Sequence, residues 1–378
     1  MTFKIVDEEP NAKIKVIGVG GAGGNAINRM VSSGMRGVEF VAINTDSQDL
    51  EDSSADERIY IGEGVTRGLG AGARPEVGRQ AIEEDREKVA EKLAGTDLVF
   101  ITAGMGGGTG TGAAPVVAEV AKEVGALAVG IVTMPFKFEG LPRTRNAEGG
   151  IDQMQEWVDT LITIQNQRLM AICSREVTFA EALVKADEVL MEATRGIADL
   201  ITTPGMINLD FNDVKTVITQ GGDAIMGVGT HRGENRATEA AKQAINSPLL
   251  EDVDIDGAKG VLINMSAGKN FTLFEVDEAT QVVQDAVGSE ANIIFGTVMD
   301  DSLVDEMRVT VIATGFNQTG EAQMEVVTGK EVEGAVQRTG TDFSEPAIKR
   351  RSDAKASDKK ELNRDSLDYP AFLRRQKA

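Results

Sequence analysis

The chain has 378 residues and a formal net charge of −21 at pH 7, and it contains one cysteine and one histidine. This length allows two domains with separate cores, while the single cysteine, Cys173, excludes an internal disulfide and favours a reducing cytoplasm. So few histidines and cysteines argue against a zinc site. So acidic a chain would repel phosphates, which argues against nucleic acid as a partner.

The ends of the chain give no sign of a membrane segment. The start, MTFKIVDEEPNAK, lacks the basic and apolar regions of a signal peptide, so residues 1–12 are expected to form a flexible N-terminus. No apolar run approaches the roughly 20 residues that span a bilayer, so direct membrane insertion is not expected. Segment 330–378 carries 12 Lys/Arg against 9 Asp/Glu, so the acidic excess lies before it.

Residues 13–185 alternate short apolar segments with helical ones. This alternation predicts a parallel sheet with helices on both faces. In that architecture ligands bind at the carboxyl ends of the strands, where loops meet the N-termini of helices. Strands are predicted at 13–20, 38–46, 97–103 and 126–136, and helices at 25–34, 75–93 and 113–125.

A long amphipathic helix is predicted at 186–205, where a Pro-Gly pair ends it. A loop and a following helix are expected in 206–221. Residues 222–316 have the mixed patterning of a second α/β domain with a mixed sheet. Strands are predicted there at 222–231, 258–268, 291–300 and 306–316, and helices at 236–246 and 276–288.

The regular patterning stops after Phe316. Residues 317–365 are rich in charged and small side chains, which predicts a disordered linker. Apolar and aromatic residues return in 366–378, and such a return at the end of a disordered segment favours a docking peptide. Its residues are Leu367, Tyr369, Pro370, Phe372 and Leu373, beside Arg374 and Arg375.

Two glycine-rich turns each join a predicted strand to a helix. The first contains the pattern G-x-G-x-x-G at Gly18, Gly20 and Gly23, and Asp46 follows 23 residues after the last of them. Alone, this pattern suggests a dinucleotide-binding oxidoreductase, which is one alternative for the chain.

The second turn, GMGGGTGTG at 104–112, has six glycines in nine residues. Glycine lets successive backbone N–H groups approach an anion closely, and a helix beginning near Thr111 adds its positive end. Thr109 and Thr111 add hydroxyl donors. Two such turns at one crevice suit a triphosphate better than a pyrophosphate. No lysine follows the glycines, so binding must rest on amides, helix dipoles and a metal cation; a packing turn explains two or three glycines but hardly six.

GGGTGTG is the signature phosphate loop of the tubulin superfamily, and the chain resembles the FtsZ family of tubulin-like GTPases. The resemblance extends from about Ile14 to Phe316 and resumes at LDYPAFLRRQ. It is carried by GVGGAGGNA, NTD at 44–46, GAGARPEVG at 70–78, PFKFEG at 135–140 with Arg143, and NLDFND at 208–213. The implied fold is tubulin/FtsZ-like α/β, with a GTP-binding domain at 13–185, a central helix at 186–205 and a C-terminal domain at 222–316.

The resemblance implies GTP and GDP as ligands, with Mg²⁺ held mainly by phosphates and water, and a monovalent cation such as K⁺ as a further expectation. The glycine turns would hold the phosphates, Ala71 to Ala73 would sense the γ-phosphate, and Asp187 would read the guanine edge. Glu139, Arg143 and Asn166 would contact the ribose. The full implied set is Gly21, Ala22, Gly23, Gly24, Asn25, Asn44, Ala71, Gly72, Ala73, Gly104, Gly106, Gly107, Gly108, Thr109, Gly110, Thr111, Glu139, Arg143, Asn166 and Asp187.

Asn208, Asp210 and Asp213 lie in the loop after the long helix, remote in sequence from the glycine turns. Carboxylates beside the phosphates of their own subunit would be repelled by them. The resemblance implies that the loop instead enters the pocket of the next subunit, where it acts on the attacking water. Such a heterologous contact does not close and makes filaments. The alternative is helix capping by Asp210 alone.

The resemblance therefore implies a self-assembling GTPase that builds the bacterial division ring, in the cytoplasm at midcell on the inner face of the membrane. A tubulin-like scaffold that binds GTP without cleaving it is the other alternative. The C-terminal peptide would dock on membrane-tethering division proteins of the FtsA and ZipA type. The residues implied for that contact are Leu367, Pro370, Phe372, Leu373 and Arg374.

Overall fold

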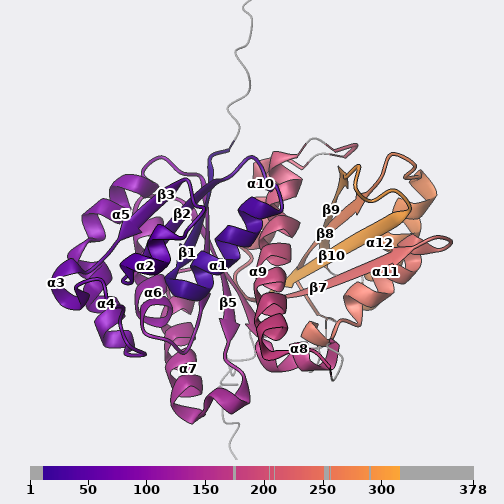
Figure 1. Cartoon of the computed structure of the whole chain (residues 1–378). Helices are drawn as coiled ribbons and strands as arrows, with labels where there is room; N and C mark the ends of the chain where they lie inside the picture. The colour runs from indigo at the N-terminus through magenta and orange to yellow at the C-terminus, as the bar shows by residue number, and fades with distance from the viewer. Residues whose placement is uncertain are drawn as a thin grey trace, which may run out of the picture. The chain divides into compact units, whose positions relative to one another are not determined.

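The computed structural model in Figure 1 describes residues 12–172, 176–203, 205–207, 209–250, 255, 257–288 and 291–315. The chain divides into two compact units, and all of these residues lie in the first, Met1–Glu321. Asn208, the linker predicted at 317–365 and the docking peptide predicted at 366–378 lie outside the described residues. None of the described helices is both long and apolar enough to cross a bilayer.

The strands of the described residues form one continuous sheet in the order β3-β2-β1-β4-β5-β6-β7-β10-β8-β9. Pairs from β3 to β7 are parallel, β10 runs antiparallel to both β7 and β8, and β9 is parallel to β8. The predicted parallel part and mixed part both form. In chain order the strands are β1 (Ile14–Val19), β2 (Glu39–Asn44), β3 (Glu57–Tyr60), β4 (Leu98–Gly104), β5 (Leu127–Met134), β6 (Thr160–Gln165), β7 (Gly222–Arg232), β8 (Gly260–Ala267), β9 (Asn292–Met299) and β10 (Glu306–Thr314).

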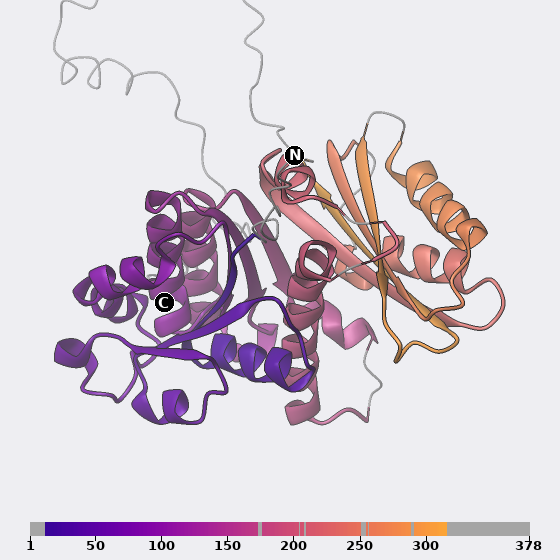
Figure 2. The same cartoon turned by 90° about the horizontal axis from the view of Figure 1, so that it is seen from above.

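The helices cover both faces of this sheet, as Figures 1 and 2 show. In the parallel part, buried side chains of α4, α5, α6 and α7 pack on one face and those of α1 and α9 on the other. The helices are α1 (Gly20–Ser32), α2 (Ser47–Glu51), α3 (Glu63–Thr66), α4 (Pro75–Glu84), α5 (Arg86–Leu93), α6 (Thr109–Glu123), α7 (Leu141–Gln155), α8 (Asn166–Ile172), α9 (Phe179–Thr202), α10 (Phe211–Ile218), α11 (Arg236–Ile245) and α12 (Leu273–Val287), with short 3-10 turns η1 (Lys137–Glu139) and η2 (Pro248–Leu250).

The long helix α9 joins the two parts of the sheet. Its buried side chains share one core with the parallel strands and with the inner face of β7 to β10, while α11 and α12 cover the outer face of those strands. The parts also pair directly through a short parallel ladder of β6 with β7, from Thr160 opposite Gly222 to Ile162 opposite Ala224. The parallel strands and the C-terminal strands are therefore joined by the helix α9 and by the β6–β7 ladder.

Several predicted helix boundaries were wrong: α1 and α6 begin at Gly20 and Thr109, five and four residues before their predicted starts, and two further differences are larger. The long helix begins at Phe179, seven residues before the predicted start, because Thr178 and Glu181 form a capping box. Glu181 N donates to Thr178 Oγ1 at 3.3 Å, and Thr178 N donates to Glu181 Oε2 at 2.7 Å. The helix predicted over 75–93 is split at Asp85, whose carboxylate accepts a hydrogen bond from Gly62 N at 2.7 Å.

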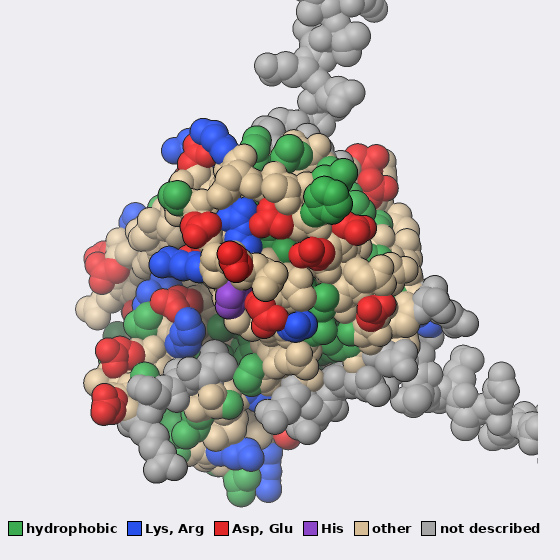
Figure 3. Space-filling view, turned by 90° about the vertical axis from the view of Figure 1, so that its right-hand side faces the viewer, with side chains coloured by type: hydrophobic (Ala, Val, Ile, Leu, Met, Phe, Trp, Pro, Cys, Tyr) green, Lys and Arg blue, Asp and Glu red, His purple; other side chains and the backbone are tan. Residues whose placement is uncertain are grey.

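The outer side of the C-terminal part, turned toward the viewer in Figure 3, carries interspersed acidic and basic side chains. They are not gathered into one basic patch on this face. A basic face or stripe is the usual footprint of a nucleic-acid binder. This face therefore gives no support to nucleic acid as a ligand.

Candidate functional site

The two glycine turns meet at one edge of the sheet. β1 leads directly into α1, and β4 ends at Gly104, five residues before α6 begins. β1 and β4 pair in parallel with Val19 opposite Ala103, so both turns leave the same edge. A Cβ on Gly20 would lie 3.0 Å from Gly110 N, which means that the turns touch. The structure thus brings the two predicted turns together.

The glycines of these turns fall into two groups. A Cβ on Gly23 would lie 2.5 Å from Thr102 O, and one on Gly110 would lie 2.6 Å from another backbone oxygen, so close packing requires glycine there. Nothing lies within 4 Å of a Cβ built on Gly24 or Gly107. Packing does not explain the second group. Open backbone at the N-termini of α1 and α6 suits an anion that approaches the amides.

Side-chain hydroxyls beside the second turn form hydrogen bonds within the protein. Thr109 Oγ1 lies 2.6 Å from Thr45 Oγ1, in a hydrogen bond between the two loops. Thr111 is buried, and its Oγ1 accepts a hydrogen bond from Gly106 N at 2.9 Å. Thr111 therefore shapes the turn from inside, whereas Thr109 is only half-buried. Asn44 is buried at the end of β2 and its Oδ1 accepts from Thr45 N at 2.8 Å.

The loop that precedes α4 lies directly on the second turn. A Cβ on Gly108 would lie 2.7 Å from Ala71 Cβ, and Ala71 is buried. Gly72 and Ala73 have φ of +58° and +55°, which is costly for alanine. Asn146 Nδ2 of α7 donates to Ala73 O at 3.4 Å and supports this conformation. The backbone of the loop is thus held at the phosphate turn.

The predicted sugar contacts lie at the start of α7 and α8. Glu139 Oε2 forms an ion pair with Arg143 Nη1 at 2.8 Å, and a Cβ on Gly106 would lie 2.8 Å from Arg143 O. Asn166 follows β6, is 7% exposed, and its buried Oδ1 has no hydrogen-bond partner among the described residues. Because a buried acceptor without a partner is costly, this atom favours a ligand that donates to it.

Asp187 is paired with a residue that sequence reasoning missed. Arg29 Nε of α1 donates to Asp187 Oδ2 at 3.1 Å. Burial raises the pKa of Asp187, and the Arg29 guanidinium opposes that shift. Arg29 lies four residues after Asn25, which lines the cavity at the first glycine turn. This spacing puts both residues on one face of α1 and could have indicated that Arg29 belongs to the site.

The acidic loop lies far from the glycine turns of its own chain. Helices α1 and α9 run side by side in the same direction, with Arg29 beside Asp187, Ser33 beside Arg195 and Gly37 beside Thr202. The first turn is therefore at the N-terminal end of α9, while Asp210 follows its C-terminal end and is the N-cap of α10, a helix labelled in Figure 1. Since α9 has 24 residues, the two ends are separated by roughly 36 Å.

Asp210 and Asp213 are both exposed at the start of α10. Asp210 Oδ1 accepts a hydrogen bond from Asp213 N at 2.8 Å, which makes Asp210 the N-cap of α10. The capping alternative is thus part of the structure. It does not account for the Asp213 carboxylate, which has no side-chain partner among the described residues.

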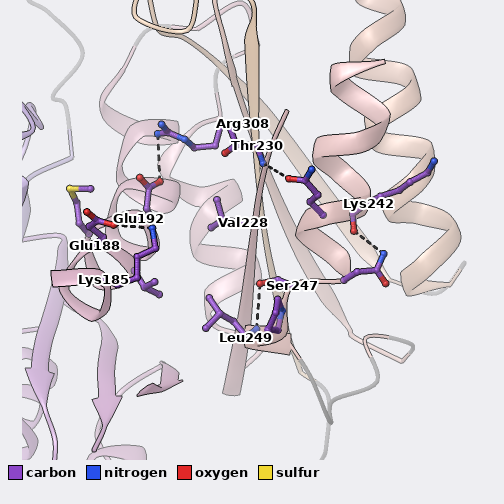
Figure 4. A pocket seen from close by; sticks show the side chains of 14 residues that line it. Lys185, Glu188, Glu192, Val228, Thr230, Lys242, Ser247, Leu249 and Arg308 are labelled. Carbon is purple, nitrogen blue, oxygen red and sulfur yellow. Dashed lines mark hydrogen bonds and ion pairs between the residues drawn. The ribbon is translucent and has the colours of Figure 1, made fainter. Parts of the chain in front are cut away.

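A cavity of about 130 Å³ opens beside the first glycine turn. A larger one, of about 790 Å³, lies between α9, the strands and the end of α11, as Figure 4 shows. In Figure 4, Lys185, Glu188 and Glu192 line it from α9, opposite Thr230 and Arg308. The glycine turns do not line the larger cavity, so its size does not make it the nucleotide site. The residues that line the smaller one include Gly20, Gly21, Gly24, Asn25, Asn44 and Asp49.

The described residues contain no cluster of three or more histidine, cysteine, aspartate or glutamate side chains that could hold a metal ion. The glycine turns themselves carry no lysine or arginine. A bound triphosphate would therefore be held chiefly by amides and helix N-termini.

Comparison with known proteins places this arrangement in a family. Residues 13–174 match the Tubulin/FtsZ family, GTPase domain, and residues 222–317 match the FtsZ family, C-terminal domain. An empty FtsZ dimer from M. jannaschii is 46% identical, with a TM-score of 0.79, over 82% of this chain and 89% of that one.

Two more distant structures share the fold. CetZ1 from Haloferax volcanii, a GDP-bound monomer, is 21% identical with a TM-score of 0.70, over 81% of this chain and 95% of that one. CetZ2 from Haloferax volcanii, a protofilament bound to GTPγS, is 23% identical with a TM-score of 0.67, over 81% of this chain and 94% of that one. With two touching glycine turns and both domains matched, the oxidoreductase and the nonenzymatic scaffold are set aside: the chain belongs to the FtsZ family, the tubulin-like GTPases that bind and hydrolyse GTP and form filaments in cell division.

Proposed function

We propose that the GTPase site of this protein is completed between two subunits. The glycine turns of one subunit would hold GTP, and the loop with Asp210 and Asp213 of the next subunit would act on it. The observation that carries this proposal is the separation of roughly 36 Å along α9 between the two halves of the site. No rotation of a side chain spans that distance within one chain.

Each half of the site is built for its part. On the nucleotide side, the free amides at the N-termini of α1 and α6 and the open backbone at Gly107 would bind phosphate oxygens. On the other side, Asp213 and Asp210 are exposed at a rigid helix start, where they can orient a water for attack on the γ-phosphate. Mg²⁺ would supply charge neutralisation at the phosphates and be held mainly by them and by water.

Guanine recognition would use Asp187. A carboxylate can accept from both N1–H and the exocyclic amine of guanine, and adenine offers no such pair. Asp187 lies at 14% side-chain exposure, and Arg29 holds it by one of its oxygens. The ion pair would keep the carboxylate ionised and oriented until the base arrives. Asn166 Oδ1 would take a donor from the sugar.

Exposed apolar side chains support an end-to-end contact between copies. At the nucleotide end, Phe138 and Phe179 are 63% and 61% exposed and their rings pack edge to face. Next to the acidic loop in sequence, Met206 is 66% exposed, and at the start of α12 Leu273 and Phe274 are each 80% exposed. Large apolar side chains exposed in groups mark interaction surfaces. A heterologous contact between two different ends extends into a filament rather than closing.

The test is the rate of phosphate release per subunit as the concentration of the full chain is raised. A site shared between subunits predicts little turnover below a threshold and a steep rise above it. A rate per subunit that does not change with concentration would contradict the proposal. Sedimentation with GTP and with GDP, on the same samples, should place the threshold of assembly at the same concentration.

The place of action and the partners rest on family resemblance. We propose that the filaments act in the cytoplasm at the midcell division site and that the C-terminal peptide docks on membrane-tethering proteins of the FtsA and ZipA type. The peptide's residues lie outside the described part of the chain. Removing residues 366–378 should leave GTP turnover intact and abolish recruitment to vesicles that carry such a tether.

A further inference from the structure

A groove of about 250 Å³ lies beside the second glycine turn, between α4, α6 and α7. Its floor is tight, because a Cβ on Gly112 would lie 2.0 Å from Pro75 O. Its wall is partly open, since nothing lies within 4 Å of a Cβ built on Gly149. Arg79, Arg145 and Asn146 also line it. Glu76 lines it as well, so the groove combines a tight glycine floor with sides that carry two arginines and one glutamate.

Two arginines without ion-pair partners among the described residues stand at or next to this groove: Arg145 lines it, and Arg74 directly precedes Pro75, which also lines it. Arg74 is the residue before α4, and Arg145 lies in the first turns of α7; both are exposed. The residues next to them in sequence are hydrogen-bonded, because Asn146 Nδ2 donates to Ala73 O at 3.4 Å. The backbones of the two arginines therefore lie close together. Within the described ranges neither guanidinium forms an ion pair. In contrast, the neighbouring Arg143 forms an ion pair with Glu139 of η1 at 2.8 Å.

A free pair of guanidinium groups fits carboxylate or phosphate oxygens, which match the planar donors of arginine. Two sources of such oxygens are at hand: the γ-phosphate of the subunit's own nucleotide, and a carboxylate of another copy. The second source is the better match. Asp213 is exposed and its carboxylate has no partner in the part of the chain described here, and Asp210 holds only a backbone N–H. Unpaired cations and unpaired anions thus stand at the two different ends of one chain.

We propose that Arg74 and Arg145 receive the acidic loop of a second copy, the loop that carries Asp210 and Asp213. The inference rests on the proposed shared active site and adds the surface that admits the loop. Two carboxylates that approach a bound triphosphate meet strong repulsion, in a chain whose net charge is already −21. Arginines at the rim offset this charge, speed the encounter and fix the register of the two copies.

The first experiment compares the variant Arg74→Ala/Arg145→Ala with Lys122→Ala in the full chain. Lys122 is an exposed lysine near the C-terminal end of α6, away from the groove, so its loss controls for a change in charge. The threshold of assembly with GTP, measured by sedimentation, should rise about tenfold or more in the double variant and stay near wild type in the control. GTP binding by dilute subunits, measured with a fluorescent nucleotide, should stay within about twofold of wild type in both.

The second experiment exchanges charges across the contact. Arg145→Glu and Asp213→Arg should each raise the threshold, and the chain that carries both should assemble at a lower concentration than either. Arg74→Glu with Asp213→Arg tests the other pairing. Assembly is measured rather than hydrolysis, since Asp213 belongs to the proposed catalytic loop. Thermal unfolding of each variant confirms that the subunits are folded.

Three results would overturn the inference. The double alanine variant could assemble like wild type, or it could lose GTP affinity as a dilute subunit, which would assign the arginines to the subunit's own γ-phosphate. Rescue in neither charge exchange would assign them to a different acidic group. If the active site is not shared between subunits, the wild-type chain should instead release phosphate at a rate per subunit that does not change with concentration. The two failures are therefore distinguishable.

Discussion

Arg29 Nε and Asp187 Oδ2, 158 positions apart in sequence, lie 3.1 Å apart and tie α1 to α9. α1 begins at the first glycine turn, and α9 continues to the acidic loop at its other end. The contact therefore joins the helix that would bind phosphate to the helix that leads to the partner subunit. It also places a positive charge against the carboxylate that would read guanine.

We expect Arg29→Met to make GTP binding more sensitive to acid. Burial raises the pKa of Asp187 and Arg29 lowers it, so loss of Arg29 raises that pKa further. Guanine recognition needs the ionised carboxylate of Asp187. As the pH is lowered, Arg29→Met should therefore lose GTP affinity at a higher pH than wild type does. Fluorescent GTP titrations of dilute subunits, repeated at pH values below 7, measure this. Equal acid sensitivity in Arg29→Met and wild type would contradict the role of the ion pair.

We expect Asp199→Asn to change how the stability of the protein depends on pH. Burial raises the pKa of Asp199 from its ordinary value of 3.8 to about 6, against the lowering effect of Arg195 and Arg308. Because the folded state binds this proton more tightly than the unfolded state, ionisation destabilises the fold as pH rises through the window between the two pKa values. The cost reaches about 3 kcal/mol above that window.

Unfolding by urea, measured for both chains at several pH values, tests this directly. The stability of Asp199→Asn relative to wild type should increase as pH rises, with about 1 kcal/mol of the change falling between roughly pH 5 and pH 8. Glu192→Gln, which removes another carboxylate from the same helix, is the comparison. A pH-independent difference between Asp199→Asn and wild type would contradict the assignment.

The glycine turns allow packing and ligand binding to be separated. Gly112→Ala would force a Cβ to 2.0 Å from Pro75 O, so α4 and α6 must move apart, at a cost of about 1–3 kcal/mol. Gly107→Ala meets nothing within 4 Å, so the unfolding free energy should stay near wild type. GTP affinity should nevertheless fall in Gly107→Ala, because the added methyl group occupies space that the phosphates would use. Thermal unfolding and nucleotide titration give the two readings.

The parts of the site that depend on residues close together in sequence could be predicted. The two turns could be located because glycine clusters between an apolar strand and a helix have few other uses, and parallel strands bring them to one edge. The start of α9 was predictable in principle, since Thr178 and Glu181 carry the spacing of a capping box. The sequence reading assigned no helix at α7, where only Ala147, Gly150 and Met154 are buried and glycines blur the periodicity.

Contacts between remote segments stayed beyond sequence reasoning. The ladder of β6 with β7 has three residue pairs, too few to leave a pattern, yet it makes one sheet of two parts. Arg29 and Asp187 meet only because α1 and α9 cover the same face of that sheet. Thr111 was predicted as a hydroxyl donor to the phosphates, and the glycine pattern gave no sign that its buried Oγ1 accepts a hydrogen bond from Gly106 N within the turn.

Asp210 offers the sharpest separation of structure from chemistry. Its carboxylate caps α10 through Asp213 N at 2.8 Å, so Asp210→Ala removes both a cap and a charge. Asn caps a helix about as well as Asp, so Asp210→Asn should keep the unfolding free energy within about 0.5 kcal/mol of wild type, while Asp210→Ala costs about 1 kcal/mol.

Turnover should respond to charge rather than to capping. If the ionised group orients the water on the next subunit's nucleotide, Asp210→Asn should bind GTP and sediment as filaments yet release phosphate at least about 100-fold more slowly, as loss of a catalytic base or water-positioning group does. Thr216→Ser, at an exposed residue of the same helix, serves as the control. Normal phosphate release by Asp210→Asn filaments would leave the carboxylate with capping as its whole role, because the amide would then suffice for both tasks.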